Sequence, residues 1–261
     1  MTGSTEPAVL DLSPAPGAAP PLRKITAQTG HELRALLRNG EQLLLTLIIP
    51  VLLLVLFGAT SLLDLGTDRR VDFLAPGVLA LAVMSTAFTG QAIGTGFERR
   101  YGVLKRLGAT PLSRTGLIAA KTLTVLLVEV LQTLVICGVA FGLGWRPQGD
   151  PLSVALLLLL GTAAFSGLGL LMAGTLRAEA TLAAANLVYL LLLALGGVVF
   201  PLARFPDGVR AVLELLPITA LSDGLRQVLQ HGAALPAGPL LVLAIWAVAG
   251  CALAARFFRW E

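Results

Sequence analysis

One carboxylate stands deep inside an apolar run, where an ionisable side chain is costly. Glu129 lies within Leu117–Leu143, and Gln132 follows three residues later on the same helix face. A carboxylate in that position could carry protons along a transport path, or it could hydrogen-bond to other helices or to a second subunit. The second role is favoured because interhelical hydrogen bonds alone can retain such residues. Asn186, in a later apolar run, is expected to bond between helices in the same way.

A second polar group forms a basic island, Phe97–Arg114, between two long apolar runs. Its charged residues are one acid, Glu98, and the cations Arg99, Arg100, Lys105, Arg106 and Arg114. A short loop with this excess of cations is expected on the cytoplasmic side of a membrane. It is also a place where a soluble partner could bind, although the cations could serve only to set the topology.

Catalytic and metal-binding groups do not come together in this sequence. It contains no G-x-x-x-x-G-K-[ST] phosphate loop, so no ATP site of that kind is expected. His31 and His231 lie outside the apolar runs, and Cys137 and Cys251 lie in two different ones. We therefore expect no enzyme activity, no metal and no cofactor in this chain. The net charge of +4 follows from membrane topology and gives no argument for nucleic acid.

Long apolar runs must position these groups. Hydrophobic residues make up 56% of the 261 residues and charged residues 13%, against about 25% charged in soluble domains. A membrane-spanning helix needs about 20 mostly apolar residues. The expected spans are Leu43–Leu63, Phe73–Thr95, Leu117–Leu143, Pro151–Thr175, Ala180–Phe200 and Leu240–Phe257. The sequence therefore predicts an all-α polytopic membrane protein with six transmembrane helices.

The distribution of lysine and arginine predicts the orientation. Most of the nineteen fall in the segments that share a side with both termini, so both termini are expected in the cytoplasm and the chain in the plasma membrane. Residues 1–24 are rich in proline, alanine and glycine and have no apolar core. They are expected to form a disordered cytoplasmic tail rather than a signal peptide, with the membrane domain over residues 25–261.

Shorter helices are expected on both sides of the spans. Thr29–Glu32 has the pattern of a capping box and predicts the start of an interfacial helix before the first span. Pro50 is expected to kink that span. The outer segment, residues 201–239, has apolar periodicity over Val209–Leu216 and again over Thr219–Gln230. These two short amphipathic helices are expected to be re-entrant or to lie in the membrane interface.

Three segments together resemble the type-2 ABC transporter permeases, including actinobacterial drug-resistance exporters. Glu32–Gly58 is similar to the family's elbow helix and first span, which has a central proline. Phe97–Arg114 resembles its cytoplasmic loop E-R-x-x-G-x-L-K-x-L-x-x-[ST]-P-L-S, and Leu216–Leu229 resembles its outer segment L-P-x-[ST]-x-x-x-D-x-L-R. The resemblance covers the chain from Ile25 to the C-terminus.

The resemblance implies a permease subunit of an ATP-driven exporter. A separate ATPase subunit would hold ATP and Mg²⁺, and a second permease subunit, identical or a paralogue, would complete the pathway in the lipid membrane. By position, the residues that would form or flank the ATPase contact are Glu98, Arg99, Arg100, Gly102, Leu104, Lys105, Arg106 and Leu107. The apolar spans suit a hydrophobic or amphiphilic cargo. Two alternatives stay open: a proton-coupled secondary transporter that uses Glu129, and a non-transporting membrane scaffold.

Overall fold

The structure is a bundle of helices. The computed structural model describes residues 19–40, 44–59, 70–198, 202 and 205–258, and no strand occurs among them. In chain order the helices are α1 (Pro21–Leu37), the π-helical η1 (Leu44–Ile48), α3 (Ile49–Ala59), α4 (Arg70–Val83), the π-helical η2 (Met84–Gly90), α5 (Gln91–Arg100), α6 (Val103–Gly108), α7 (Arg114–Gly142), α8 (Pro151–Thr175), α9 (Ala178–Leu195), α10 (Asp207–Leu213), α11 (Pro217–Leu229) and α12 (Ala237–Phe257).

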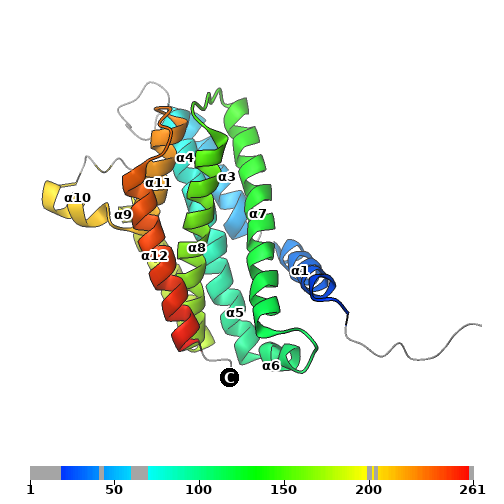
Figure 1. Ribbon diagram of the computed structural model, residues 1–261. Coiled ribbons are helices and arrows are strands. Elements are labelled where there is room, and N and C mark those ends of the chain that lie inside the picture. The colour runs from blue at the N-terminus through cyan, green and yellow to red at the C-terminus, as the bar shows by residue number, and fades with distance from the viewer. Residues whose placement is uncertain (1–18, 41–43, 60–69, 199–201, 203–204, 259–261) are drawn as a thin grey trace, which may run out of the picture.

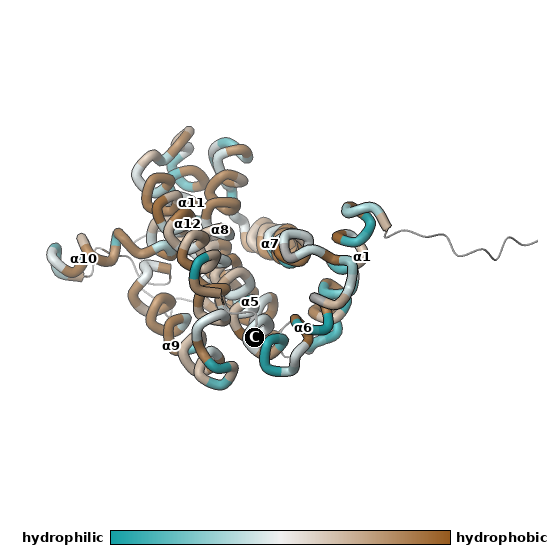
Figure 2. The backbone as a smooth tube through the Cα atoms, turned by 60° about the horizontal axis from the view of Figure 1, so that its bottom comes forward, coloured by the Kyte–Doolittle hydropathy of each residue, from teal (hydrophilic) through white to brown (hydrophobic). Residues whose placement is uncertain are grey.

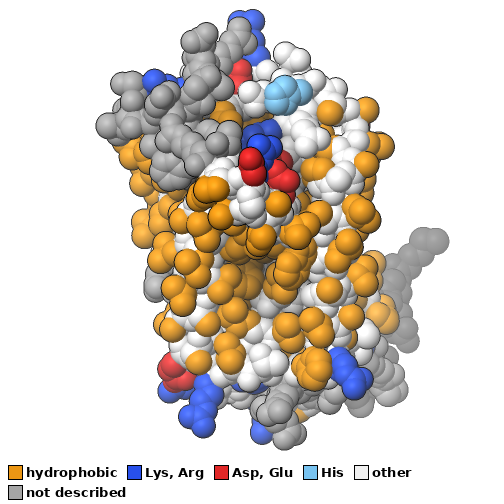
Figure 3. All heavy atoms as spheres, turned by 90° about the vertical axis from the view of Figure 1, so that its left-hand side faces the viewer, with side chains coloured by type: hydrophobic (Ala, Val, Ile, Leu, Met, Phe, Trp, Pro, Cys, Tyr) orange, Lys and Arg blue, Asp and Glu red, His pale blue; other side chains and the backbone are white. Residues whose placement is uncertain are grey.

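Five helices are long and apolar enough to cross a membrane, and Thr46–Ala59 forms a shorter apolar helix. The predicted all-α polytopic membrane protein is therefore confirmed. The predicted ends of the first and fifth spans, residues 60–63 and 199–200, and the first eighteen residues of the predicted tail lie outside the described part of the chain. Figure 3 shows apolar side chains across the middle of the face that carries α9, α10 and α12, with charged side chains near its two ends.

The second span is the central helix of the bundle. α4, η2 and α5 form one continuous helix, Arg70–Arg100, whose most apolar stretch is 94% buried, whereas that of α9 is 17% buried. Helices α3, α7, α8, α9 and α11 all pack against parts of it. The prediction ended this span at Thr95, so the first residues of the basic island in fact belong to its last turn (Figure 1).

Two glycines let α8 approach its neighbours closely. A Cβ at Gly167 would lie 2.6 Å from the backbone nitrogen of Cys251 in α12, and one at Gly169 would lie 2.9 Å from the carbonyl oxygen of Phe88 in η2. Backbones this close leave no room for a side chain. Helix α8 is thereby fixed between the central helix and α12.

Helix α1 begins earlier than predicted. Pro21 is its first residue, a position that suits proline because the first helical residues need no N–H partner. Thr29 therefore lies inside the helix, and its hydroxyl donates to the Ile25 carbonyl at 2.9 Å. The capping-box prediction is wrong, since the helix has already started two turns before Thr29. α1 packs against α7 near α6, and the chain is markedly polar there (Figure 2).

The outer segment contains two helices with different surroundings. α10 projects from the bundle, and its apolar residues Val209 and Val212 are exposed (Figure 1). α11 starts at Pro217, is buried along nearly its whole length, and packs against α4, α8 and α12. The prediction that two short helices follow the fifth span is confirmed, and α11 is an integral part of the bundle.

Candidate functional site

The middle of the basic island, Val103–Gly108, forms the short helix α6 at one end of the bundle (Figure 1). Gly102 starts it with φ +68°, a left-handed conformation that glycine adopts without strain. Leu104 is only 5% exposed and fixes α6 on the bundle, while Lys105 and Arg106 are exposed. Leu107 lines a cavity between α6 and α1. The α6 surface that faces away from the protein is therefore cationic.

The two arginines before α6 are engaged within the chain. Arg99 donates from Nη1 to the Gly174 carbonyl at 2.7 Å and from Nη2 to the Leu176 carbonyl, both at the end of α8. Arg100 forms an ion pair with Glu179 at the start of α9. Cations suit the carbonyl end of a helix because the helix dipole is negative there. These contacts attach the end of α5 to the α8–α9 junction.

A buried ion-pair cluster joins three helices beside α6. Lys121 of α7 is 9% exposed, and its Nζ lies 2.6 Å from Glu98 Oε2 of α5 and 3.4 Å from Glu32 Oε1 of α1. The cluster lines a polar cavity of about 280 Å³. Sequence reasoning missed it, because no spacing along the chain relates residues 32, 98 and 121.

Glu129 makes an interhelix hydrogen bond in the middle of the bundle. The Thr162 hydroxyl of α8 donates to Glu129 Oε2 at 2.5 Å, and the Glu129 side chain is 6% exposed. Its second oxygen, Oε1, is buried without a hydrogen-bond partner in the described part of the chain. The hydrogen bond joins α7 to α8.

Gln132 compensates for the proline in the first span. Pro50 has no N–H to give to the Thr46 carbonyl one turn earlier, and Gln132 Nε2 donates to that carbonyl at 2.5 Å. Gln132 Oε1 accepts from the Thr86 hydroxyl at 3.0 Å. The regular α-helical pattern is interrupted just before Pro50, where η1 is π-helical. Gln132 thus links α7 to the first and second spans.

Asn186 is placed differently from these two residues. It is exposed on the outer face of α9, and its side chain makes no hydrogen bond to the residues that the structure describes. The expected bond between helices is therefore not formed among the described residues of this chain.

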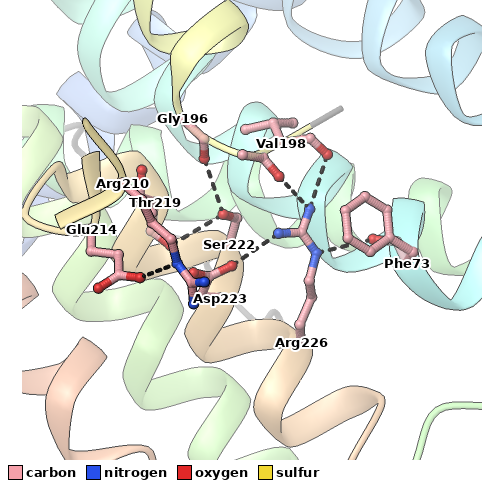
Figure 4. A network of polar contacts seen from close by, with 10 residues as sticks. Phe73, Gly196, Val198, Arg210, Glu214, Thr219, Ser222, Asp223 and Arg226 are labelled. Carbon is pink, nitrogen blue, oxygen red and sulfur yellow. Dashed lines mark hydrogen bonds and ion pairs between the residues drawn. The ribbon is translucent and has the colours of Figure 1, made fainter. Parts of the chain in front are cut away.

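A buried arginine organises the opposite end of the bundle (Figure 4). The Arg226 guanidinium donates to the Phe73 carbonyl at 3.3 Å, to the Gly197 and Val198 carbonyls at 2.7 and 3.0 Å, and to Asp223 Oδ1 at 3.0 Å. These five residues form the Arg226 node. The node joins α11 to the start of α4 and to the chain that leaves α9.

Phe73 and Gly77 of α4 enclose the Arg226 guanidinium closely. It lies over the Phe73 ring, 3.9 Å from the ring centroid, which is a cation–π geometry. A Cβ at Gly77 would lie 2.6 Å from the Val198 carbonyl oxygen and 3.0 Å from Arg226 Nη2. Burial raises the pKa of Asp223, and the charge of Arg226 offsets part of that rise. The sequence analysis did not single out Arg226 and so missed this role.

The family comparison accords with this arrangement. A family profile described as ABC-2 type transporter matches residues 23–229, which run from α1 through α11 and include α6 and the Arg226 node. The chain belongs to the ABC-2 type transporter family. It is therefore a permease component of an ABC transporter, and the family predicted from three segments is confirmed. A comparison with curated proteins gives no match.

In this ABC-2 permease several described polar residues connect helices at the two ends of the bundle. Among the residues with described positions, no group of three or more His, Cys, Asp and Glu side chains could hold a metal ion. The ion pairs and buried hydrogen bonds instead join α1, α5 and α7 at the α6 end and α4, α9 and α11 at the opposite end. Through these contacts, a shift of one helix can move the helices that are bonded to it.

Proposed function

We propose that this permease exports a hydrophobic or amphiphilic compound and is driven by a separate ATPase that docks on α6. The observation that carries the proposal is the exposed cationic surface of Lys105 and Arg106, on a helix fixed to the bundle by the buried Leu104. A soluble partner can reach these two cations without entering the membrane. Docking there places α6 in the cytoplasm, and with it both termini.

The contacts around α6 supply a route for movement. Arg99 and Arg100 connect the end of α5 to the α8–α9 junction, and Lys121 connects α5 to α1 and α7. A displacement of α6 by the ATPase would therefore act on several helices together. A second permease subunit, identical or a paralogue, would complete the pathway, and the exposed apolar face of α9 with Asn186 is available for it.

The test is a purification of the tagged permease from its native membranes, followed by mass spectrometry of the proteins that accompany it. We expect a stoichiometric ATPase with a Walker-type phosphate loop. Its recovery should fall at least about fivefold when Lys105 and Arg106 are both replaced by Glu. A partner surface that complements these cations is acidic, and it would then be repelled by the two glutamates.

Arg210→Glu is the matched control, because Arg210 is an exposed arginine at the other end of the bundle. This variant should retain the ATPase at the wild-type level. Equal recovery from wild type and from the Lys105→Glu, Arg106→Glu double variant would refute docking on α6.

A proton-coupled carrier is the second candidate, and the unpartnered Oε1 of Glu129 favours it. Such a carrier would transport in vesicles without ATP and would stop when Glu129 is made neutral. The hydrogen bond from Thr162 is the reason to prefer a connecting role for this residue. Transport that needs ATP and persists in Glu129→Gln would exclude the carrier.

A further inference from the structure

The surface of α1 that faces away from α7 carries a line of cations. Arg23, Arg34 and Arg38 are exposed and follow one another at spacings of 11 and 4 residues. At 3.6 residues per turn, these spacings bring the three within about 60° of one another around the helix. None of them has an ion pair or a side-chain hydrogen bond with the residues that the structure describes. Their guanidinium groups are therefore available to a partner outside the chain.

Small residues separate the first two arginines. Ala27 and Gly30 lie on the same face of the helix between Arg23 and Arg34, and both are exposed. A Cβ at Gly30 would meet no atom within 4 Å, so the space above it is open. We call residues 23, 27, 30, 34 and 38 the α1 stripe. It is a low surface with a cation at one end and two at the other.

The acidic residue of α1 points the other way. Glu32 is the one acid between Pro21 and Leu37. Its Oε1 accepts from Gln28 Nε2 at 2.9 Å and lies 3.4 Å from Lys121 Nζ of α7. The α1 stripe therefore has no counter-ion on its own helix, and an anion that neutralises it must come from elsewhere.

The contacts of α1 fix its depth in the membrane. The membrane-spanning stretch of α7, Thr115–Gly142, has 28 residues and is about 42 Å long. This length matches a bilayer with both headgroup layers, which is about 40–45 Å thick. Lys24 Nζ of α1 donates to the Pro111 carbonyl at 2.8 Å, just before α7, and Glu32 pairs with Lys121, two turns into α7. α1 therefore lies at the level of the lipid headgroups and the first acyl carbons.

An apolar line runs parallel to the cations. Leu22, Leu33 and Leu37 each precede one of the three arginines, so they have the same spacings and lie about 100° from the cations around the helix. Leu22 is 73% exposed and Leu37 is 41% exposed. A helix with adjoining apolar and cationic faces is suited to the boundary between acyl chains and headgroups.

We propose that the α1 stripe binds the headgroup of an anionic phospholipid in the leaflet on the α6 side, with the leucine line against its acyl chains. The charge of the stripe calls for an anion, and its depth and apolar edge call for a lipid. A soluble partner is less suited, because it would have to enter the headgroup layer, whereas α6 lies beyond α1 at the end of the bundle (Figure 1). The inference goes beyond the proposed function and does not rest on it, since lipid binding requires no ATPase.

Lipid binding to the purified full-length permease tests the proposal. Dioleoyl phosphatidylglycerol and dioleoyl phosphatidylcholine have the same chains and differ in headgroup charge, so native mass spectrometry with each lipid measures the headgroup preference. A cation near an anionic lipid surface strengthens binding about fivefold. A headgroup that contacts two arginines should therefore be bound about 25-fold more tightly when it is phosphatidylglycerol. When Arg23, Arg34 and Arg38 are all replaced by Gln, the preference should fall to about threefold or less.

The matched control removes three exposed arginines from other parts of the chain, Arg146, Arg177 and Arg210, each replaced by Gln. It makes the same change in net charge and leaves the α1 stripe intact, so the preference should stay above about tenfold. The site is located with a phosphatidylglycerol that carries a diazirine beside its glycerol backbone. Irradiated with the permease in nanodiscs, this lipid should label α1 and the first two turns of α7.

Gly30→Glu tests the stripe without risk to the helix. Glutamate forms helix more readily than glycine, and the position is open, so α1 should fold at least as well as in the wild type. The new carboxylate lies one turn before Arg34 and pairs with it. The preference for phosphatidylglycerol should fall at least about fivefold, whereas Gly30→Gln should retain it.

Three results would overturn the proposal. The first is equal binding of the two lipids by the wild type. The second is an equal loss of preference in the stripe variant and in the control that lacks three other arginines, which would mean that only net charge matters. The third is an unchanged lipid preference in the stripe variant together with loss of a co-purified ATPase, which would assign these arginines to the ATPase contact.

Discussion

Arg226→Met should strongly destabilise the permease. Methionine retains the apolar stem of the side chain but removes every donor of the guanidinium. The carbonyls of Phe73, Gly197 and Val198 would lose their shared partner. Asp223 would keep its charge in a half-buried position without a counter-ion. Removing one partner of a buried pair costs about 3–5 kcal/mol.

The chain contains a matched comparison for this change. Arg210 and Glu214 form an ion pair of similar geometry, with N–O distance 2.8 Å, but both side chains are about half exposed. Exposed pairs contribute about 0–1 kcal/mol. Arg210→Met is the same chemical substitution in the same outer segment. The difference in stability between the two variants therefore measures what burial and the carbonyl contacts of Arg226 contribute.

The assay is thermal unfolding of the detergent-purified permease, followed by the loss of its monodisperse peak in size-exclusion chromatography. For a chain of this size, 3–5 kcal/mol corresponds to a fall of about 6–20 °C in the midpoint. Arg210→Met should shift it by no more than about 4 °C. Adding Asp223→Leu to Arg226→Met should restore part of the loss, because no unpaired acid then remains. Equal shifts for the two arginine variants would refute the central role of the node.

Three further substitutions test other contacts. Glu129→Gln keeps the acceptor for Thr162, so ATP-driven transport should continue at more than about half of the wild-type rate in reconstituted vesicles; complete loss with normal assembly would contradict the connecting role. Gln132→Leu removes the donor to the Thr46 carbonyl and the acceptor for the Thr86 hydroxyl, and it should cost about 1–3 kcal/mol in the thermal assay; an unchanged midpoint would show that these two contacts do not stabilise the bundle. Gly102→Ala should cost about 1–2 kcal/mol, because the left-handed conformation strains any residue with a Cβ; no change would mean that α6 starts differently.

The apolar runs predicted the spans well because hydropathy and proline act locally. α8 was predicted with the bounds it has, Pro151–Thr175, since a proline begins a continuous apolar run there. The same signal could not tell which span is central. Helix Arg70–Arg100 is enclosed by protein and α9 is largely open, yet both are apolar because lipid and protein interiors favour the same residues.

The polar contacts were only partly predictable. Glu129 and Gln132 stood out because each is conspicuous inside an apolar run. Lys121 and Arg226 lie near the ends of apolar stretches, where a cation is usually solvated and needs no partner. Their burial depends on residues about 20 to 150 positions away, and no local pattern reports such pairings.

The Arg226 node makes the burial of α11 depend on two segments far from it in the sequence. Helix α11 carries a guanidinium that is satisfied by backbone oxygens of residue 73, at the start of α4, and of residues 197 and 198, just after α9. Before those two helices are inserted and adjacent, no such acceptors exist, and a lone guanidinium does not leave water for an apolar interior. Helix α11 can therefore take up its buried position only once residue 73 and residues 197 and 198 lie beside it.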